Sequence, residues 1–200
     1  MAAPLEDAQV VRQVLRGKQE AFGVLVERYQ KPIFNFIYRF YGNYELAQEL
    51  TQETFLRCYQ FLKSYDPERK FSTWLYTVAK NLCIDELKKQ RSVREVPLDD
   101  VLPAVDAKDY EDAVGHNQQM ECIRSEESFK ILEALQELPA GARTVLLLHY
   151  FQGLSYQEIG ETLGLPVSTV KIRIFRAKKI LLEKWHQLAG TEAPPLPGDG

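Results

Sequence analysis

What this 200-residue sequence lacks already narrows the classes of protein it can encode. Its three cysteines, Cys58, Cys83 and Cys122, are far apart and form no CxxC pair. This spacing argues against a disulfide framework or a zinc ribbon, and we expect small or buried side chains in a reducing compartment. No run approaches the roughly 18 apolar residues of a membrane span. The opening MAAPLEDAQVVRQ has no basic region before an apolar stretch, so we expect no secretion signal, no membrane insertion and a cytoplasmic protein.

Motifs of catalysis are also missing. The three histidines, His116, His149 and His186, are scattered, and we expect His149 to be packed within an apolar helix. The sequence contains no HExxH, no glycine-rich phosphate loop and no Cys-His-Asp arrangement. We therefore predict that the protein is not an enzyme and has no metal site and no cofactor.

Strand patterns are absent, and the apolar residues recur with helical spacing. The fold class predicted from this spacing is all-α, with two small helical domains joined by a flexible linker. The expected helices cover residues 5–16, 19–41, 44–63, 72–92, 128–137, 140–151, 155–163 and 167–187.

The predicted linker is acidic. Residues 95–127 contain ten acidic residues and two basic ones, with poor apolar periodicity, although the whole chain has a net charge of only −3. As a random coil this segment would span roughly 30 Å, and more if its charges repel one another. The chain is thus divided into an N-terminal helix, a first domain, the linker, a second domain and a disordered tail that includes APPLPGDG. These parts are residues 1–18, 19–94, 95–127, 128–187 and 188–200.

The second domain contains two short helices joined by a tight turn. Ser155 and Glu158 have the spacing of a capping box at the start of the first helix. Gly164 ends that helix, and Pro166 stands at the start of the next. This is the outline of a helix-turn-helix, a motif that repressors and response regulators also contain.

The second of these helices is strongly basic on one side. Residues 171–184 contain six basic residues and one acidic residue. In a major groove Ile172 could contact a thymine methyl group and Arg176 could reach guanine, while lysines would contact phosphates. The alternative is a solvated basic face favoured by the helix dipole. The stripe expected to be buried is Val170, Ile174, Ala177 and Leu181. The candidate DNA-binding residues are Ser168, Thr169, Lys171, Ile172, Arg173, Phe175, Arg176 and Lys179.

The stretch FSTWLYTVAKNLCIDELKKQR, residues 71–91, predicts an amphipathic helix in a locally basic part of the first domain. One face carries Phe71, Leu75, Val78 and Leu82, and the opposite face carries Trp74, Thr77, Asn81 and Lys88. An aromatic ring that stacks, an amide that reads a base edge and cations that hold phosphates suit unstacked single-stranded DNA. The alternative is that Trp74 and Tyr76 pack against the preceding helices.

The helix expected at 44–63 has an acidic outer face. Its apolar residues recur at Leu46, Leu50, Phe55 and Leu62. Taken alone, this pattern favours an ordinary solvated face. The outward residues are Glu45, Gln48, Glu49, Gln52 and Glu53.

Two long motifs in order carry a family resemblance. AQELTQETFLRCY with STWLYTVAKNLCIDELKK is followed, after the acidic segment, by ELPAGARTVLLLHYFQGLSYQEIGETLGLPVSTVKIRIFRAKKIL. From about residue 19 to 185 the chain resembles a bacterial sigma factor of the extracytoplasmic-function (ECF) group of the sigma-70 family.

This resemblance implies partners for the surfaces described above. The helix with Glu45, Gln48, Glu49, Gln52 and Glu53 would dock on the beta-prime clamp helices of core RNA polymerase. The loop at 63–72 would hold a flipped base of the minus-ten element. The helix after it would bind the melted strand through Trp74, Tyr76, Thr77, Lys80, Asn81 and Lys88. The helix-turn-helix would read the minus-thirty-five element.

Further partners follow from the same resemblance. The second domain would contact the beta flap of the polymerase, the acidic linker would thread the RNA exit path, and an anti-sigma factor would inhibit the protein. Two residues depart from the family pattern: Gln48 stands where many members have an acidic residue, and Ile172 replaces a common serine. We expect the second departure to alter the minus-thirty-five preference.

Two other classes of protein remain as alternatives. A stand-alone helix-turn-helix regulator would bind an operator tightly, as a dimer and without polymerase. A scaffold of helical pairs would need no polarised basic helix. The stand-alone regulator gives no role to the face of Trp74 and Asn81 or to the acidic linker.

Overall fold

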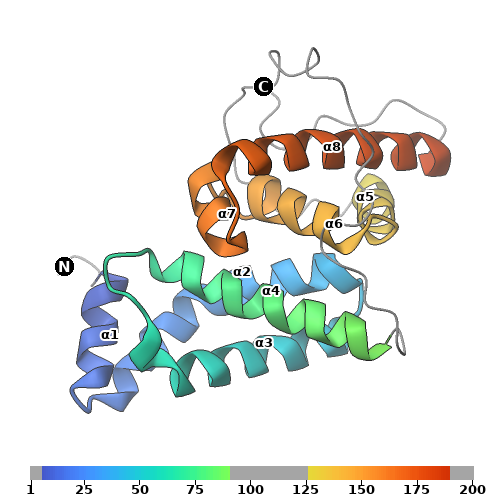
Figure 1. The fold of residues 1–200 in the computed structure, drawn as a ribbon. Coiled ribbons are helices and arrows are strands. Elements are labelled where there is room, and N and C mark those ends of the chain that lie inside the picture. The colour runs from blue at the N-terminus through green and yellow to red at the C-terminus, as the bar shows by residue number, and fades with distance from the viewer. Residues whose placement is uncertain (1–5, 91–125, 190–200) are drawn as a thin grey trace.

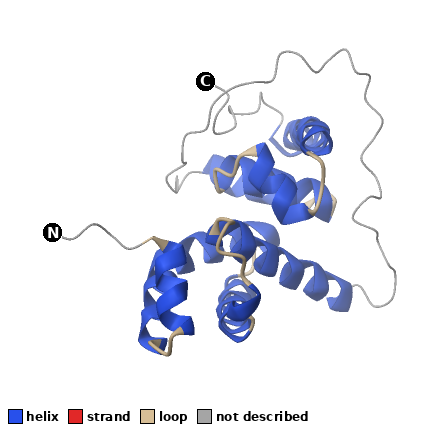
Figure 2. Cartoon of the chain, turned by 60° about the vertical axis from the view of Figure 1, so that its left-hand side comes forward, coloured by secondary structure: helices blue, strands red, loops and turns tan. Residues whose placement is uncertain are grey.

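The computed structural model describes residues 6–90 and 126–189 as two stacked groups of helices (Figure 1). The described residues contain no strand (Figure 2), in agreement with the all-α prediction. The first group contains α1 (Asp7–Leu15), α2 (Phe22–Tyr41), α3 (Tyr44–Gln60) and α4 (Phe71–Gln90). The second contains α5 (Glu126–Gln136), α6 (Ala140–Leu146), α7 (Tyr156–Leu163) and α8 (Val167–Ala189). Shorter helical turns are η1 (Gln19–Ala21), η2 (Leu62–Ser64) and the π-helical turn η4 (Leu147–Phe151).

Most helices begin and end within a few residues of the predicted limits. Two differences stand out. The helix expected from residue 19 starts with the separate 3-10 turn η1, and α5 begins at Glu126, inside the segment predicted as linker. The rest of that segment and most of the predicted tail lie outside the described residues.

Local signals explain several of these boundaries. Gly42 ends α2 in the left-handed conformation, at φ 70°. Asn43 caps α3, because its side chain accepts a hydrogen bond from the backbone N–H of Leu46 at 2.9 Å. Side-chain caps of this kind typically contribute about 1 kcal/mol. The connection between α2 and α3 is therefore set by two consecutive residues.

The core of the first group is built around α2. Ile33, Phe36, Ile37 and Phe40 on this helix are fully buried, and Phe71 of α4 packs into the same core. Burial of each large apolar side chain contributes roughly 1.5–3 kcal/mol. Because α2 contacts α1, α3 and α4, it fixes the positions of the helices that carry the predicted functional faces.

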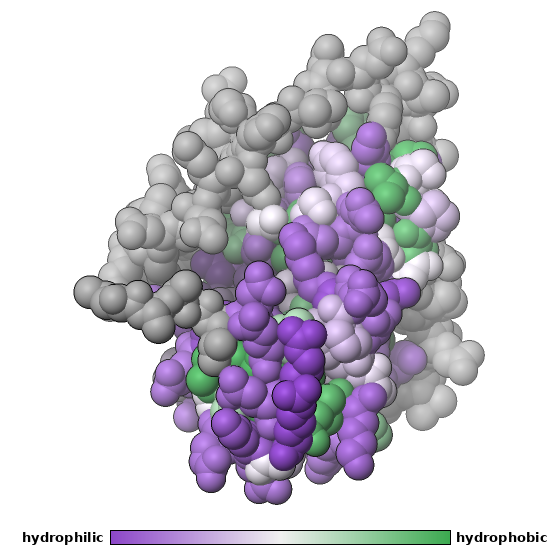
Figure 3. Space-filling model, turned by 90° about the vertical axis from the view of Figure 1, so that its left-hand side faces the viewer, coloured by the Kyte–Doolittle hydropathy of each residue, from purple (hydrophilic) through white to green (hydrophobic). Residues whose placement is uncertain are grey.

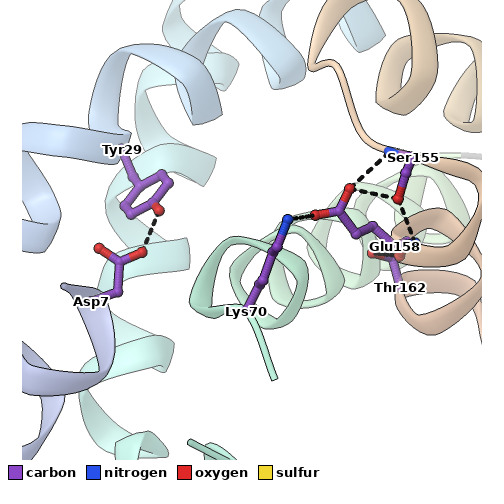
Figure 4. A network of polar contacts seen from close by, with 6 residues as sticks. All are labelled: Asp7, Tyr29, Lys70, Ser155, Glu158 and Thr162. Atoms are coloured by element: carbon purple, nitrogen blue, oxygen red, sulfur yellow. Dashed lines mark hydrogen bonds and ion pairs between the residues drawn. The ribbon is translucent and has the colours of Figure 1, made fainter. Parts of the chain in front are cut away.

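Helix α1 is joined to α2 by a polar contact as well as by packing. The carboxylate of Asp7 accepts a hydrogen bond from the hydroxyl of Tyr29 at 2.5 Å (Figure 4). It also accepts one from the guanidinium of Arg28. Burial, reinforced by the hydrogen bond to Asp7, raises the pKa of Tyr29 well above its ordinary value. The tyrosine thus remains a neutral donor at physiological pH.

The second group closes around α6 and α8. Val170, Ile174, Ala177 and Leu181 are all buried, which confirms the predicted apolar stripe of α8. They meet the apolar run that begins in α6 and continues through η4. Helix α8 consequently lies on the side of this group that faces away from the first group (Figure 1).

The two cysteines in the described part of the chain are free and buried, as expected. Burial raises the pKa of the Cys58 thiol to about 12 and shifts that of Cys83 in the same direction. Both thiols are therefore protonated and unreactive at neutral pH. Cys122 lies outside the described residues.

Candidate nucleic-acid and polymerase interfaces

The predicted helix-turn-helix is formed by α7, a tight turn and α8. Ser155 and Glu158 make the expected capping box: Ser155 N donates to Glu158 Oε2 at 2.8 Å, and Glu158 N donates to Ser155 Oγ at 3.3 Å. Gly164 ends α7 at φ 67°. Gly160 lets the turn approach closely, because a Cβ there would stand 2.8 Å from the carbonyl oxygen of Leu165. These features fix the angle at which α8 leaves the turn.

Helix α8 presents the predicted DNA-binding residues on its outer side. Ser168, Lys171, Ile172 and Lys179 are exposed, and the other four candidates, Thr169, Arg173, Phe175 and Arg176, are half-buried. Ile172 has 42 % of its surface exposed among these cations.

Val167, at the first position of α8, was not identified from the sequence. It is 41 % exposed, close to the value for Ile172. The helix-turn-helix motif predicts that Val167 stands at the start of a helix. It does not predict that Val167 is exposed, because a valine at this position could equally well be buried. The N-terminal part of such a helix is the part that enters a major groove.

The predicted single-strand face of α4 is only partly accessible. Asn81 and Lys88 are exposed, whereas Trp74, Thr77 and Lys80 are half-buried. Desolvation lowers the pKa of Lys80 from its ordinary value.

The aromatic residues of α4 have different surroundings. The ring of Trp74 packs with Tyr65 and Phe71, with centroids 5.6 and 5.8 Å away. Tyr76 is only 3 % exposed, meets Phe36 edge-on, and donates its hydroxyl hydrogen to Oε1 of Gln152 at 2.6 Å. Trp74 thus borders the loop that precedes α4, while Tyr76 is covered by a residue of the second group.

Helix α3 carries a continuous polar surface. Glu45, Gln48, Glu49 and Gln52 are exposed, and the half-buried Glu53 accepts a hydrogen bond from Arg57 Nε at 2.7 Å. The five predicted residues therefore lie on one helix, and four of them are exposed.

Beside this polar surface lies an apolar feature that the sequence reading missed. A groove of about 480 Å³ between α2 and α3 is bordered by Phe22, Val26, Gln52, Leu56 and Tyr59. Leu56 and Tyr59 are 56 % and 40 % exposed. Large exposed apolar side chains of this kind mark interaction surfaces. Phe55 was expected to be buried, so the helical period of α3 could have placed the next residue, Leu56, on the outside of the helix.

Other kinds of site are not assembled in the described residues. Within 6–90 and 126–189, no three His, Cys, Asp or Glu side chains gather as a metal site would require. No helix in these ranges combines the length and the apolar character needed to cross a membrane. The side view in Figure 3 shows a mostly hydrophilic face with small, separate hydrophobic patches.

Comparison with known proteins decides the family. Residues 25–93 match the model for Sigma-70 region 2, and residues 128–181 match that for Sigma-70, region 4. The chain is 36% identical over 194 residues to the ECF RNA polymerase sigma factor SigW of Bacillus subtilis, covering 89% of this chain and 96% of the relative. The chain belongs to the ECF group of the sigma-70 family. It is a sigma factor that directs RNA polymerase to promoters, and it is not an enzyme.

Further relatives agree with this assignment. The sigma factor is 35% identical over 180 residues to the RNA polymerase sigma-H factor of Pseudomonas aeruginosa, with 88% of this chain and 92% of the relative covered. Its fold is similar to that of CnrH, solved in complex with the cytosolic domain of CnrY. The TM-score is 0.64 and the identity 26%, with 88% and 94% of the two chains covered. Helices α3 and α4 therefore belong to region 2, and α6, α7 and α8 to region 4.

Proposed function

We propose that region 4 of this sigma factor reads the minus-thirty-five element through the outer side of α8. The observation that carries this proposal is that α8 buries its apolar stripe yet leaves Lys171 and Ile172 exposed. A helix oriented in this way can enter a major groove with its cations against phosphates and Ile172 against bases. Arg176, one turn after Ile172 and half-buried, would contact a guanine edge through its terminal guanidinium nitrogens.

We propose that region 2 binds the melted minus-ten strand at α4 and the loop before it. Asn81 and Lys88 are exposed for base and phosphate contacts. Trp74 forms an aromatic cluster with Tyr65 at the loop, and Tyr65 donates its hydroxyl hydrogen to the carbonyl oxygen of Arg69 at 2.6 Å. A loop held in this way can accept a flipped base, whose unstacking costs a few kcal/mol. Thr77 and Lys80 would extend this face, and Tyr76 would join it only after the contact with Gln152 is broken.

We propose that α3 docks on the beta-prime clamp helices of core polymerase. Glu49 and Gln52 supply polar contacts, and the adjacent apolar side chains of Leu56 and Tyr59 supply buried area. An apolar centre beside a polar rim is the usual composition of a protein interface. Glu45, Gln48 and Glu53 extend the polar part, and region 4 would contact the beta flap.

The test is transcription reconstituted from purified components. Core RNA polymerase, the full-length protein and a pool of randomised promoters would be combined, and the transcripts sequenced. We expect start sites that require the protein and that share motifs about ten and thirty-five base pairs upstream. If no such transcripts form while the protein alone binds a duplex operator tightly, a stand-alone regulator is the better description.

We also propose the setting in which this sigma factor acts. It would work in the cytoplasm at the nucleoid, in a stress response, under the control of an anti-sigma factor. The capture of CnrH, a related chain, by the cytosolic domain of another protein supports such control. A candidate anti-sigma protein should suppress transcription when it is added to the reconstituted reaction.

The domain limits that we propose remain 1–18, 19–94, 95–127, 128–187 and 188–200.

A further inference from the structure

The loop between α3 and α4 rests on a connected cluster of aromatic rings. Tyr65 of this loop meets Phe71 of α4 edge-on, with ring centroids 5.5 Å apart. The ring of Phe71 also lies 5.8 Å from that of Trp74 and 5.7 Å from that of Tyr29 on α2. Because Tyr65 and Phe71 are only 6 % and 1 % exposed, these two rings form the buried support of the loop.

The first residue of α1 is attached to the same cluster. The carboxylate of Asp7 accepts the hydrogen bond from the Tyr29 hydroxyl at 2.5 Å (Figure 4). It is also paired with the guanidinium of Arg28. Burial raises the pKa of Tyr65, and the negative charge of Asp7 adds to this shift. Asp7 therefore lies close enough to act on a tyrosine of the loop as well as on Tyr29.

The shape of the loop and its position have different causes. Within the loop, the Tyr65 hydroxyl donates to the carbonyl oxygen of Arg69 at 2.6 Å, and Glu68 N donates to Oδ1 of Asp66 at 3.0 Å. These bonds shape the exposed part of the loop but do not attach it to the rest of region 2. The attachment comes from the buried Tyr65 and from Leu62 in η2, which contacts α1.

The polar contact at Asp7 fixes an orientation that apolar packing leaves open. An aromatic pair tolerates several ring arrangements, whereas a hydrogen bond is directional. A bond from a hydroxyl to a carboxylate is also stronger than one between neutral groups. Asp7 has only 20 % of its side chain exposed, so solvent competes weakly for this bond. The carboxylate thus holds the ring of Tyr29 in one orientation against Phe71.

We propose that Asp7 is a positioning residue for recognition of the minus-ten element. Through Tyr29 and Phe71 it keeps Tyr65 and the loop in the arrangement that accepts the flipped base, and it does so without touching DNA. Side chains that form a binding site need such support to hold their geometry. Helix α1 is then part of the minus-ten reader, although it lies before the residues that match region 2. This inference rests on the proposed role of the loop.

The experiment uses holoenzyme assembled from core RNA polymerase and the full-length protein. Asp7→Ala removes the acceptor for Tyr29, whereas Asp7→Asn keeps an oxygen that can accept this bond. The matched control is Glu20→Ala, which removes an exposed carboxylate from η1. Thermal unfolding of each free protein shows whether the variant is folded.

Two DNA probes distinguish positioning of the base from a general loss of structure. Each is a fluorescein-labelled forked promoter with a duplex minus-thirty-five element and a single-stranded non-template minus-ten element, in the sequence found by the transcription assay. The second probe has an abasic site in place of the flipped base. Affinity of the holoenzyme for each probe is measured by anisotropy.

We expect Asp7→Ala to bind the complete probe roughly tenfold more weakly, a change that the loss of one hydrogen bond to a charged group can produce. Asp7→Asn should lose less, and Glu20→Ala should bind as the parent does. On the abasic probe all four holoenzymes should bind equally. An equal loss on both probes, or no loss on the complete probe, would overturn the proposal.

Tyr29→Phe provides a second test that keeps the ring in the cluster. It removes only the hydroxyl that binds Asp7, so it decides the question even if Asp7→Ala does not fold. We expect it to weaken binding of the complete probe and to leave binding of the abasic probe unchanged. Parent-like binding of the complete probe by a folded Tyr29→Phe variant would exclude the route through Tyr29.

The parent holoenzyme separates this inference from the proposed function. If the abasic site does not weaken binding by the parent, the loop holds no flipped base and its proposed role is wrong. If the abasic site weakens the parent while Asp7→Ala and Tyr29→Phe bind the complete probe as the parent does, only the inference about Asp7 fails.

Discussion

The guanidinium of Arg143 lies over the ring of Phe40 and donates a hydrogen bond to the carbonyl oxygen of the same residue. It also donates to the carbonyl oxygens of Gln136 and of Leu138, the latter at 2.9 Å. Arg143 is only 5 % exposed, so a single buried cation connects the end of α2 with the loop before α6. A cation at this end of a helix is favoured by the helix dipole.

Replacing Arg143 with methionine should destabilise the protein. The substitution removes the donor and leaves buried carbonyl groups unpaired, and each unpaired group costs roughly 1–3 kcal/mol. We expect a loss of at least about 3 kcal/mol in the free energy of unfolding, measured by urea denaturation. Arg12→Met, at an exposed position of α1, is the control. Equal urea midpoints of unfolding for the two variants would contradict a structural role for Arg143.

Replacing Ile172 with serine should change the minus-thirty-five preference at one base position. The exposed isoleucine favours a methyl group in the groove, whereas a hydroxyl can hydrogen-bond to any base edge. We expect discrimination at that position to change by about 1–3 kcal/mol. Selection from randomised promoters with parent and variant holoenzymes measures this. The role assigned to Ile172 is wrong if both select the same sequence.

Replacing Lys179 with alanine should weaken DNA binding without changing its specificity. This exposed lysine is placed to contact phosphates, which carry no sequence information. We expect similar losses of affinity for every minus-thirty-five sequence. The slope of log affinity against log salt concentration should fall in magnitude by about one, because one fewer counterion is released. Binding of duplexes at several salt concentrations tests this prediction. A loss confined to one sequence would place Lys179 at a base instead.

Replacing Leu56 with aspartate should impair binding to core polymerase. The side chain is exposed beside the groove between α2 and α3, so a charge there disrupts an apolar contact but not the fold. We expect at least about a tenfold loss of affinity, or about 1.4 kcal/mol, in titrations with core enzyme. Glu27→Ala, at an exposed position of α2, should bind as the parent does. Equal affinities for Leu56→Asp and the parent would remove this groove from the interface.

The contact between Lys70 and Glu158 should weaken in acid. Burial alone would raise the pKa of Glu158, but hydrogen bonds from Lys70 and Ser155 outweigh it and hold the pKa below its ordinary value of 4.5. Because the folded pKa is depressed, this stabilisation is present above pH 4.5 and is lost as the pH falls through the lower folded value.

Small-angle X-ray scattering and the free energy of unfolding, both measured between pH 7 and pH 3, test this prediction. The parent should be more stable than Glu158→Gln at neutral pH, and the difference should shrink below the ordinary pKa of the carboxyl group. The variant retains a residue suited to the capping box, which limits damage to α7. A difference that does not change with pH would mean that the charge of Glu158 is not involved.

Much of the local structure could be predicted from the sequence. The stripe of α8, the capping box at Ser155 and the left-handed Gly164 depend on spacing and on side chains near in sequence. These patterns act over one or two helical turns, so the residues themselves specify them. The family resemblance rests on the same stretches, and the comparisons confirm it.

Contacts between the two regions depended on the tertiary structure. Glu158 was predicted as the partner of the N-cap Ser155 in a capping box, but its pairing with Lys70 joins residues 88 positions apart. Tyr76 and Gln152 are 76 positions apart. Nothing in the helical period of α4 shows that its outer side meets another domain, because a half-polar face fits solvent, DNA or protein equally well. The sequence by itself determined the helices and the order of the two regions. Only tertiary packing decided which functional faces are open, since burial there depends on residues that are distant along the chain.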